Sequence, residues 1–281
     1  MNPQTILPGS EAWPSRVDAL AKPPKELVVV GRIPAGPRVA IVGTRRADRA
    51  ALAFTETLAK DLARLGVCIV SGGAFGVDAA AHRGALAEGS TVAVLAGDIH
   101  NPAPRAHAAL FEAVPQRGAI VSEHEGGIER ATDFLKRNRL IAALADATIV
   151  VQAPARSGAL STARHCLRLN RPLLVVPAAP WDPRGKGNLG LLDKGLVCRG
   201  VKDVAEVLRL RIPRRRQRAR KSALPQELAT VREVLSNEPR HVDELARALD
   251  RDVALLQQQL LALVLRGEAV CEDGRWLAAS R

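Results

Sequence analysis

Short apolar runs that alternate with helical patterns constrain the fold of this 281-residue chain more than any other feature. The runs are rich in valine and isoleucine, as in "VAIVG" (39–43), "TVAVLAG" (91–97) and "TIVVQA" (148–153). Between them, leucine and alanine recur at helical spacing. Strands of continuous apolar character are buried on both faces. The alternation therefore predicts an α/β fold with a doubly wound, mostly parallel sheet covered by helices on both sides.

The pattern changes after residue 210. The stretch "RIPRRRQRARKS" (211–222) carries seven bases and no acids and predicts a basic linker. Beyond it, three helical segments precede a hairpin that turns near Asp273-Gly274, which is the outline of a winged helix. We therefore divide the chain into an N-terminal extension (1–25), the α/β domain (26–210), the linker and the winged helix (223–281).

Positive charge is concentrated in the α/β domain and the linker. The chain has a net charge of +12, to which residues 1–210 contribute +8, residues 211–222 +7 and residues 223–281 −3. A surplus of this size suggests a polyanionic partner. The chain has no tyrosine, four phenylalanines and three tryptophans. Since base stacking needs aromatic side chains, we expect a nucleic acid to be bound through its backbone.

Composition and spacing argue against several classes of protein. No apolar run approaches the length of a membrane span, and the first residues lack the pattern of a signal peptide, so we expect a cytoplasmic protein with no membrane partner. The four cysteines form no C-x-x-C pair, and the six histidines show no ligand spacing, so we expect no metal. The chain has neither a Walker loop nor G-x-G-x-x-G, and we expect no cofactor.

The glycine-rich turn "SGGAFGVDAAAH" (71–82) follows one of the apolar runs. Strand, glycine turn and helix together let backbone N–H groups approach a phosphate. The same glycines are also what a tight strand-to-helix turn requires. The segment alone does not decide between these two interpretations.

Polar and basic residues follow the other predicted strands. Since the carboxyl ends of parallel strands meet at one edge of a sheet, these residues should lie together and suit phosphate oxygens. Each also has a structural interpretation; Ser157, for example, is a good N-cap residue. The residues are Gly43, Thr44, Arg45 and Arg46 after the first strand, Arg156, Ser157 and Gly158 before a helix, and Lys186 in a later glycine-containing loop.

No catalytic group stands out. His82 and Asp78 lie four residues apart on one predicted helix face, but no nucleophile in a strained turn accompanies them. Glu123 is the one obvious acid at a predicted strand end, and a loop acid is usually solvated. We therefore assign no catalytic residue and expect a protein that is not an enzyme.

Six motifs resemble, in order, those of the DNA-processing protein A (DprA/Smf) family: "PPKELVVVG", "VAIVGTR", "SGGAFGVDAAAH", "FLKRNRLIAAL", "SGALSTA" and "VVP". The resemblance covers about residues 23 to 205, and a winged helix of the same family fits after 223. It implies an extended Rossmann-like domain that binds and protects single-stranded DNA and loads the RecA recombinase during natural transformation. It also implies a homodimer.

The resemblance also implies DNA-binding positions, each taken from a matching motif. These are Gly43, Thr44, Arg45, Ser71, Gly72, Gly73, Lys136, Arg137, Asn138, Arg139, Ser157 and Gly158. Together with Arg46, Arg156 and Lys186 from the strand ends, they form the predicted DNA-binding set.

Two other functions remain open. A Rossmann-like nucleotide-binding hydrolase, similar to the phosphoribohydrolases, would use a glycine turn and a glutamate, but their P-G-G-x-G-T-x-x-E turn is absent from this chain. A winged-helix regulator would bind duplex DNA, which the net negative charge of residues 223–281 disfavours.

Overall fold

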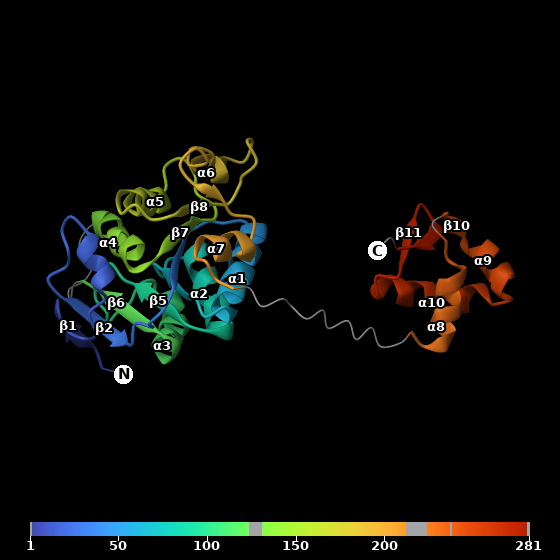
Figure 1. Ribbon diagram of the computed structural model, residues 1–281, viewed down its shortest axis with the longest axis horizontal. Coiled ribbons are helices and arrows are strands. Elements are labelled where there is room, and N and C mark those ends of the chain that lie inside the picture. Colours follow the sequence, from blue (N-terminus) through green and yellow to red (C-terminus); the bar gives the residue numbers. More distant parts are fainter. Residues whose placement is uncertain (1, 124–130, 212–223, 237, 280–281) are drawn as a thin grey trace. The chain divides into compact units, whose positions relative to one another are not determined.

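The computed structural model describes residues 2–123, 131–211, 224–236 and 238–279. The chain divides into two compact units, Met1–Ile212 and Pro213–Arg281 (Figure 1). The predicted basic linker lies almost entirely outside the described residues.

The large unit is built on one nine-stranded sheet with the order β1-β2-β6-β5-β4-β3-β7-β8-β9. The strands from β6 to β9 in this order run parallel to one another, while β2 pairs antiparallel with β6 and β1 antiparallel with β2. This confirms the mostly parallel sheet. The strands are β1 (Gln4–Ile6), β2 (Leu27–Gly31), β3 (Arg38–Val42), β4 (Cys68–Ser71), β5 (Thr91–Val94), β6 (Ala119–Ser122), β7 (Ala147–Val150), β8 (Leu173–Val175) and β9 (Leu196–Val197).

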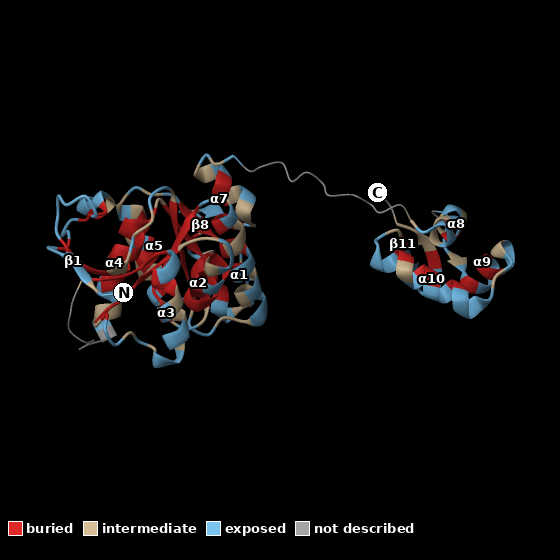
Figure 2. Cartoon of the chain, turned by 90° about the horizontal axis from the view of Figure 1, so that it is seen from below, coloured by how far each residue is buried: buried red, intermediate tan, exposed pale blue. Residues whose placement is uncertain are grey.

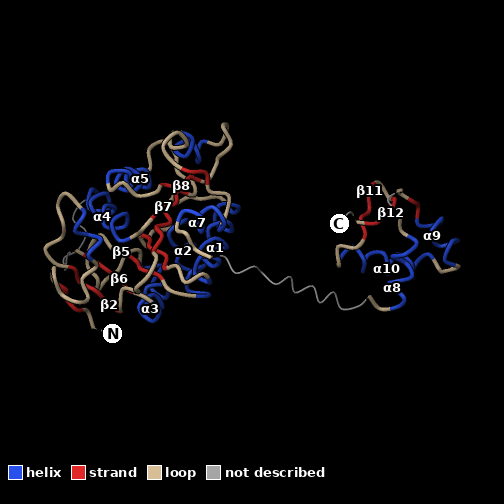
Figure 3. The backbone as a smooth tube through the Cα atoms, in the orientation of Figure 1, coloured by secondary structure: helices blue, strands red, loops and turns tan. Residues whose placement is uncertain are grey.

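Helices cover both faces of this sheet, so the doubly wound arrangement is also confirmed (Figure 3). Helices α1, α2, α3 and α7 pack on one face, and α4 and α5 pack side by side on the other. The helices of the large unit are α1 (Arg49–Arg64), α2 (Val77–Glu88), α3 (Ala108–Arg117), α4 (Ala131–Leu144), α5 (Gly158–Arg168), α6 (Lys186–Leu189) and α7 (Val201–Val207), with short 3₁₀ turns η1 (Ser15–Ala19), η2 (Arg105–His107) and η3 (Pro183–Gly185).

Alternate residues of each central strand enter different cores. In β3, Val39 and Ile41 pack with α1 and α2, while Ala40 and Val42 pack with α4 and α5. All four are buried, and Figure 2 shows buried residues concentrated in the sheet and on the helix faces that cover it. Period-two alternation with apolar residues on both faces is what a sheet between two helical layers requires.

The first 25 residues, which we set apart as an extension, are part of the large unit. Strand β1 adds to the sheet edge by pairing Thr5 with Val28. Trp13 and Val17 are buried in the core that includes α4. The chain before β2 therefore closes one side of the sheet.

The second unit has the predicted winged-helix arrangement of three helices and a hairpin. Strands β11 and β12 form the hairpin, whose turn uses left-handed backbone at Asp273 (φ 49°) and Gly274 (φ 77°). Leu245, Leu256 and Leu260 fill a core of its own. The elements are α8 (Gln226–Val234), β10 (Arg240–His241), α9 (Val242–Leu249), α10 (Val253–Leu265), β11 (Ala269–Glu272) and β12 (Arg275–Ala278).

Among the described residues, every helix is too short or too polar to cross a lipid bilayer.

Candidate nucleic-acid interface

A concave pocket of about 510 Å³ opens at the carboxyl ends of β3 and β7. Strand β3 lies between β4 and β7, and the chain leaves β3 for α1 on one face and β7 for α5 on the other. Such a point of reversal is where open α/β sheets bind ligands. We call this cavity the strand-end pocket. Nine residues of the predicted DNA-binding set line it: Gly43, Thr44, Arg45, Arg46, Arg137, Asn138, Arg156, Ser157 and Gly158.

The loop after β3 is held by its neighbours on both sides. The backbone N–H of Thr44 donates to the Gln152 carbonyl oxygen at 2.6 Å, and the N–H of Val77 donates to the Thr44 carbonyl oxygen at 3.3 Å. A Cβ at Gly43 would lie 2.5 Å from Cγ2 of Val77, so this position admits only glycine without a shift. The loop therefore presents Arg45 and Arg46 from a fixed backbone.

Close packing explains two of the glycines in the turn, which is one of the two interpretations that the sequence left open. Gly76 has a φ of 75°, and a Cβ there would lie 2.3 Å from the Thr44 carbonyl oxygen. A Cβ at Gly73 would lie 2.8 Å from the Phe111 ring. The Ser71 hydroxyl is buried and donates to the Ile41 carbonyl oxygen at 2.7 Å. Gly76 thus lets the turn pack against the loop after β3, Gly73 lets it pack against α3, and Ser71 bonds to β3. None of the three lines the strand-end pocket.

Arg137 was expected to meet DNA directly, but its guanidinium is used inside the protein. Its Nη1 donates to the carbonyl oxygens of Val94 and Gly72, the latter at 2.7 Å. Burial lowers the pKa of Arg137 to about 10, against the effect of Asp78, so the guanidinium stays charged at neutral pH. Burial likewise raises the pKa of Asp78, and the Arg137 charge opposes that rise. Arg137 and Asp78 thus form the charged floor of the pocket.

Arg45, Arg46 and Arg156 are the exposed cations of the strand-end pocket. None of them is ion-paired with a carboxylate among the residues that the structure describes. The guanidinium carbon of Arg45 lies 4.9 Å from the centre of the Phe134 ring, a cation–π contact that orients it. Three arginine side chains around one cavity are suited to bind anionic oxygens.

The N-terminus of α5 completes the pocket. Ser157 is its N-cap, as the structural interpretation predicted, and its hydroxyl accepts from the Ala159 N–H at 3.2 Å. Asn138 Nδ2 donates to the Gly158 carbonyl oxygen at 3.0 Å and joins α4 to this end of α5. The first turn of α5 has no acidic residue. The positive end of its dipole therefore adds to the arginine charge.

The remaining basic residues of the predicted set lie outside this pocket. Lys136 is on the exposed surface of α4 and pairs with Asp133, with 3.1 Å between Nζ and Oδ1. Arg139 donates to both carboxylate oxygens of Glu123, at 2.6 Å for Oε2, and to the Lys22 carbonyl oxygen. Lys186 is exposed at the start of α6. Gly72 lines a smaller neighbouring cavity of about 220 Å³.

Sequence reasoning missed the aromatic residues of this region. Phe134 lines the strand-end pocket, and Phe75 is exposed on the glycine turn next to the pocket residue Ala74. Both lie inside quoted motifs, "SGGAFGVDAAAH" and "FLKRNRLIAAL", which is the signal that could have found them. Two of the four phenylalanines of the chain thus lie at this edge of the sheet.

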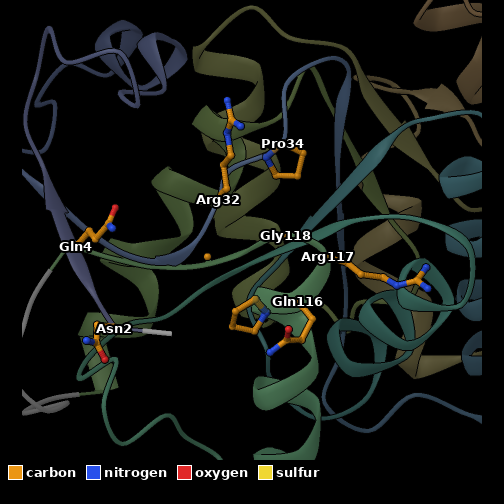
Figure 4. Close-up of a pocket in the computed structure, with 9 residues that line it drawn as sticks. Asn2, Gln4, Arg32, Pro34, Gln116, Arg117 and Gly118 are labelled. Carbon is orange, nitrogen blue, oxygen red and sulfur yellow. The ribbon is translucent and has the colours of Figure 1, made fainter.

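A larger cavity, of about 670 Å³, lies at the opposite edge of the sheet, where β2 ends and β6 begins. Arg32 and Arg117 line it, but Figure 4 shows the two side chains pointing in different directions. No pair of basic groups converges there on one ligand. The strand-end pocket is therefore the better candidate for an anion.

Together, the doubly wound sheet, with an arginine-lined pocket at its switch point, and the winged helix define a two-domain protein of the Rossmann-like class. Residues 4–210 match the family described as DNA recombination-mediator protein A, and residues 215–275 match the DprA winged helix domain. The chain belongs to the DNA recombination-mediator protein A family, which confirms the resemblance seen in the sequence.

Named relatives agree with this assignment. The putative DNA processing protein DprA of Mycobacterium tuberculosis is 37% identical, over 96% of this chain and 76% of that protein. The DNA processing protein DprA of Bacillus subtilis is 32% identical, over 68% of this chain and 66% of that protein.

Two solved structures share the fold. DNA processing protein A of Streptococcus pneumoniae superposes with a TM-score of 0.68 and 26% identity, over 75% of each chain. That of Helicobacter pylori has a TM-score of 0.66 and 34% identity, over 73% of this chain and 95% of its own, and its structure describes a single-stranded DNA binding mode.

Proposed function

We propose that this protein binds single-stranded DNA in the strand-end pocket and acts as a recombination mediator that loads RecA onto that strand. The observation that carries the proposal is the set of three exposed arginines, Arg45, Arg46 and Arg156, beside the N-terminus of α5. The Helicobacter pylori relative, which binds single-stranded DNA, supports it.

The shape of the pocket favours a single strand over a duplex. A concave cavity of about 510 Å³ can take a backbone that bends into it. Duplex DNA is stiff over a length of about 150 base pairs and cannot bend sharply without cost. A single strand can place successive phosphates against the arginines while its bases point outward.

The direct test is a binding titration of the full chain with an oligo-dT strand and with a blunt duplex of the same length. Three phosphate contacts on a single strand predict a slope of log K against log salt of about −2. We expect tighter binding to the single strand with at least this slope. Equal affinity for the duplex, or a flat salt response, would contradict the proposal.

RecA loading and dimer formation are part of the same proposal. Exposed Leu196 and Val197 on the edge strand β9 offer an apolar surface for a second copy, and light scattering tests the mass in solution. RecA loading is tested by RecA filament assembly on single strands already coated with a single-strand-binding protein. The wild-type chain should accelerate assembly, and a variant with Arg45, Arg46 and Arg156 all replaced by Gln should not.

We further propose that the protein has no hydrolase activity. Glu123, the acid that the hydrolase alternative would use, is bound through both carboxylate oxygens by Arg139 and is therefore already paired with a cation. The purified chain should leave ATP and nucleoside monophosphates intact. Turnover that survives repurification and disappears in Glu123→Gln would support the hydrolase instead.

A further inference from the structure

We propose that Phe75, supported by His107, forms a stacking site for one unpaired base of the strand that the strand-end pocket binds. This inference rests on the proposed function and adds a contact to the base where the pocket supplies contacts to phosphate. It goes beyond our sequence-based expectation that a nucleic acid is bound through its backbone.

The Phe75 ring is exposed and held in place. It is 47% exposed, so part of its aromatic surface is accessible to a ligand. The ring centres of Phe75 and His107 are 4.6 Å apart at an angle of 64°, an edge-to-face contact. His107 Nδ1 lies 3.0 Å from the Gly73 carbonyl oxygen, and its ring also meets the buried Phe111 edge-to-face at 6.2 Å. Phe75 is thus oriented by a partner that is itself anchored to the core.

Phe75 lies next in the chain to a residue that lines the strand-end pocket. Ala74, which precedes Phe75, lines the pocket, and consecutive Cα atoms are about 3.8 Å apart. Gly76, which follows it, packs against the carbonyl oxygens of Thr44 and Arg45. The backbone that follows Phe75 therefore packs against the loop that carries Arg45. We infer that a strand whose phosphate meets Arg45 can bring a neighbouring base to the Phe75 ring.

Phe75 is better placed for stacking than Phe134. The Arg45 guanidinium already covers Phe134 at 4.9 Å, so the contact it can offer a base is shared with that cation. Among the described residues, Phe75 makes an edge-to-face contact with His107 and no cation–π contact. Every base has a face that can stack, and one stacked base contributes about 1–3 kcal/mol to single-strand binding. The site needs no particular sequence, which fits a protein that handles any incoming strand.

The test compares Phe75→Leu with wild type on two strands of equal length and charge, oligo-dT and a strand of abasic phosphate-sugar units. Leucine keeps the apolar volume and removes the aromatic face. On oligo-dT we expect Phe75→Leu to weaken binding between about fivefold and a hundredfold, from the stacking energy per base. On the abasic strand the two proteins should bind equally. Phe54→Leu, in α1 and outside the lining of the strand-end pocket, is the matched control and should bind both strands like wild type.

A second measurement uses Phe75→Trp, which keeps an aromatic face and reports on it. Oligo-dT should quench its fluorescence beyond the change seen in wild type, whose Trp13, Trp181 and Trp276 give the background. Thermal unfolding of each variant checks that the fold is intact.

The outcomes separate this inference from the proposed function. If wild type fails to bind oligo-dT, both are wrong. If Arg156→Gln weakens binding while Phe75→Leu does not, the pocket stands and the stacking site is overturned, as it would be if Phe75 served a protein partner. If Phe75→Leu weakens binding to the abasic strand as much as to oligo-dT, the ring supports the loop and does not stack on a base.

Discussion

Arg156 and Lys136 are both exposed cations near the same edge, but their surroundings differ. Arg156 lines the strand-end pocket and has no carboxylate partner among the described residues, whereas Lys136 pairs with Asp133 outside it. We predict that Arg156→Gln weakens single-strand binding about tenfold and makes the salt slope shallower by about 0.7, the loss of one phosphate contact. Lys136→Gln should change both much less. Fluorescence anisotropy over a range of salt measures the two quantities.

The opposite ranking of the two variants in binding affinity would show that the DNA lies elsewhere on the surface. If Lys136→Gln costs more than Arg156→Gln, the strand crosses the exposed surface of α4 and not the pocket. Circular dichroism of both variants serves as the control, since neither side chain is buried.

His82 gives the large unit a specific sensitivity to acid. It is fully buried, and the Thr91 hydroxyl, which donates to the Ile69 carbonyl oxygen, accepts from His82 Nδ1 at 2.7 Å. His82 Nε2 is buried without a partner in the described structure. Burial lowers the pKa of His82 to about 3, from an ordinary value near 6.5. Between pH 6.5 and pH 3, His82 is therefore protonated in the unfolded chain but not in the folded chain.

The sign of the effect follows from that difference in proton uptake. Stability from this group is fully present above pH 6.5 and decreases as the pH falls toward 3. We predict that acidification from pH 7 to pH 5 lowers the free energy of unfolding by about 2 kcal/mol through His82 alone. His82→Asn keeps a donor for Thr91 and removes the titration, so its loss over the same range should be smaller by that amount. Urea unfolding at the two pH values measures it, and identical pH profiles would contradict it.

The run of residues from Lys136 to Arg139 shows what sequence could not predict at this scale. A helix turns about 100° per residue, so four adjacent polar side chains point in four directions. Lys136 is exposed, and Arg137 is buried and donates to the Gly72 carbonyl oxygen of the glycine turn. Asn138 donates to the Gly158 carbonyl oxygen at the start of α5, and Arg139 binds Glu123. The motif indicated this region of α4, but only the packing of the helix shows which of its side chains reaches the strand-end pocket.

At the scale of elements, the glycine turn before α2 controls how the strand-end loops fit together. Gly76 has a φ of 75° and lies against the Thr44 carbonyl oxygen, where a Cβ would come within 2.3 Å. We predict that Gly76→Ala lowers the free energy of unfolding by about 1–3 kcal/mol from backbone strain, with a further loss from the clash. Gly66→Ala is the matched control, because Gly66 has a φ of 80° but open space around it.

The difference between the two alanine variants isolates the contact with Thr44. Urea unfolding gives both values, and Gly76→Ala should be clearly the less stable. It should also weaken single-strand binding, because moving the turn moves the loop that carries Arg45. Equal stability of the two variants would show that the turn can move away from Thr44 at little cost.

The parallel strands from β3 to β8 could be predicted from the sequence because each is a continuous apolar run, and runs of this kind have few alternatives in a sheet covered on both faces. Strand β1 and the turn η1 could not be. Gln4–Ile6 is only three residues long and has one buried residue, which is too short for an alternating pattern of apolar residues to be recognised. What fixes them is contact with distant segments, such as the hydrogen bond from Arg16 Nε to Asp146 Oδ1 at 2.7 Å.

At the scale of the whole molecule, the two units differ in charge and in what their helices can contact. A winged helix that reads duplex DNA usually places one helix in the major groove and binds phosphates with basic residues. In the second unit, α10 (Val253–Leu265) contains no charged residue, and α9 begins with Asp243 and Glu244. Residues 223–281 have a net charge of −3 and would be repelled by phosphate.

This distribution of charge predicts how binding depends on chain length. A chain that ends at Leu210 keeps all of α7 and the Leu210 N–H to Ala205 carbonyl hydrogen bond, so the large unit should stay folded. It should retain most of the single-strand affinity. A chain that ends at Ser222 adds seven bases and should bind more tightly than either the shorter chain or the full one.

The measurement is a titration of oligo-dT with the three lengths, 1–210, 1–222 and 1–281, at low and at high salt. The gain from 210 to 222 should shrink at high salt, because contacts made by solvated bases are screened and release fewer counterions. The loss from 222 to 281 should shrink as well, since it comes from repulsion. If binding requires the full chain at both salt concentrations, the winged helix itself contacts the strand. The apolar surface of α10, with Leu261 and Leu265 exposed, would then have to contribute what charge cannot.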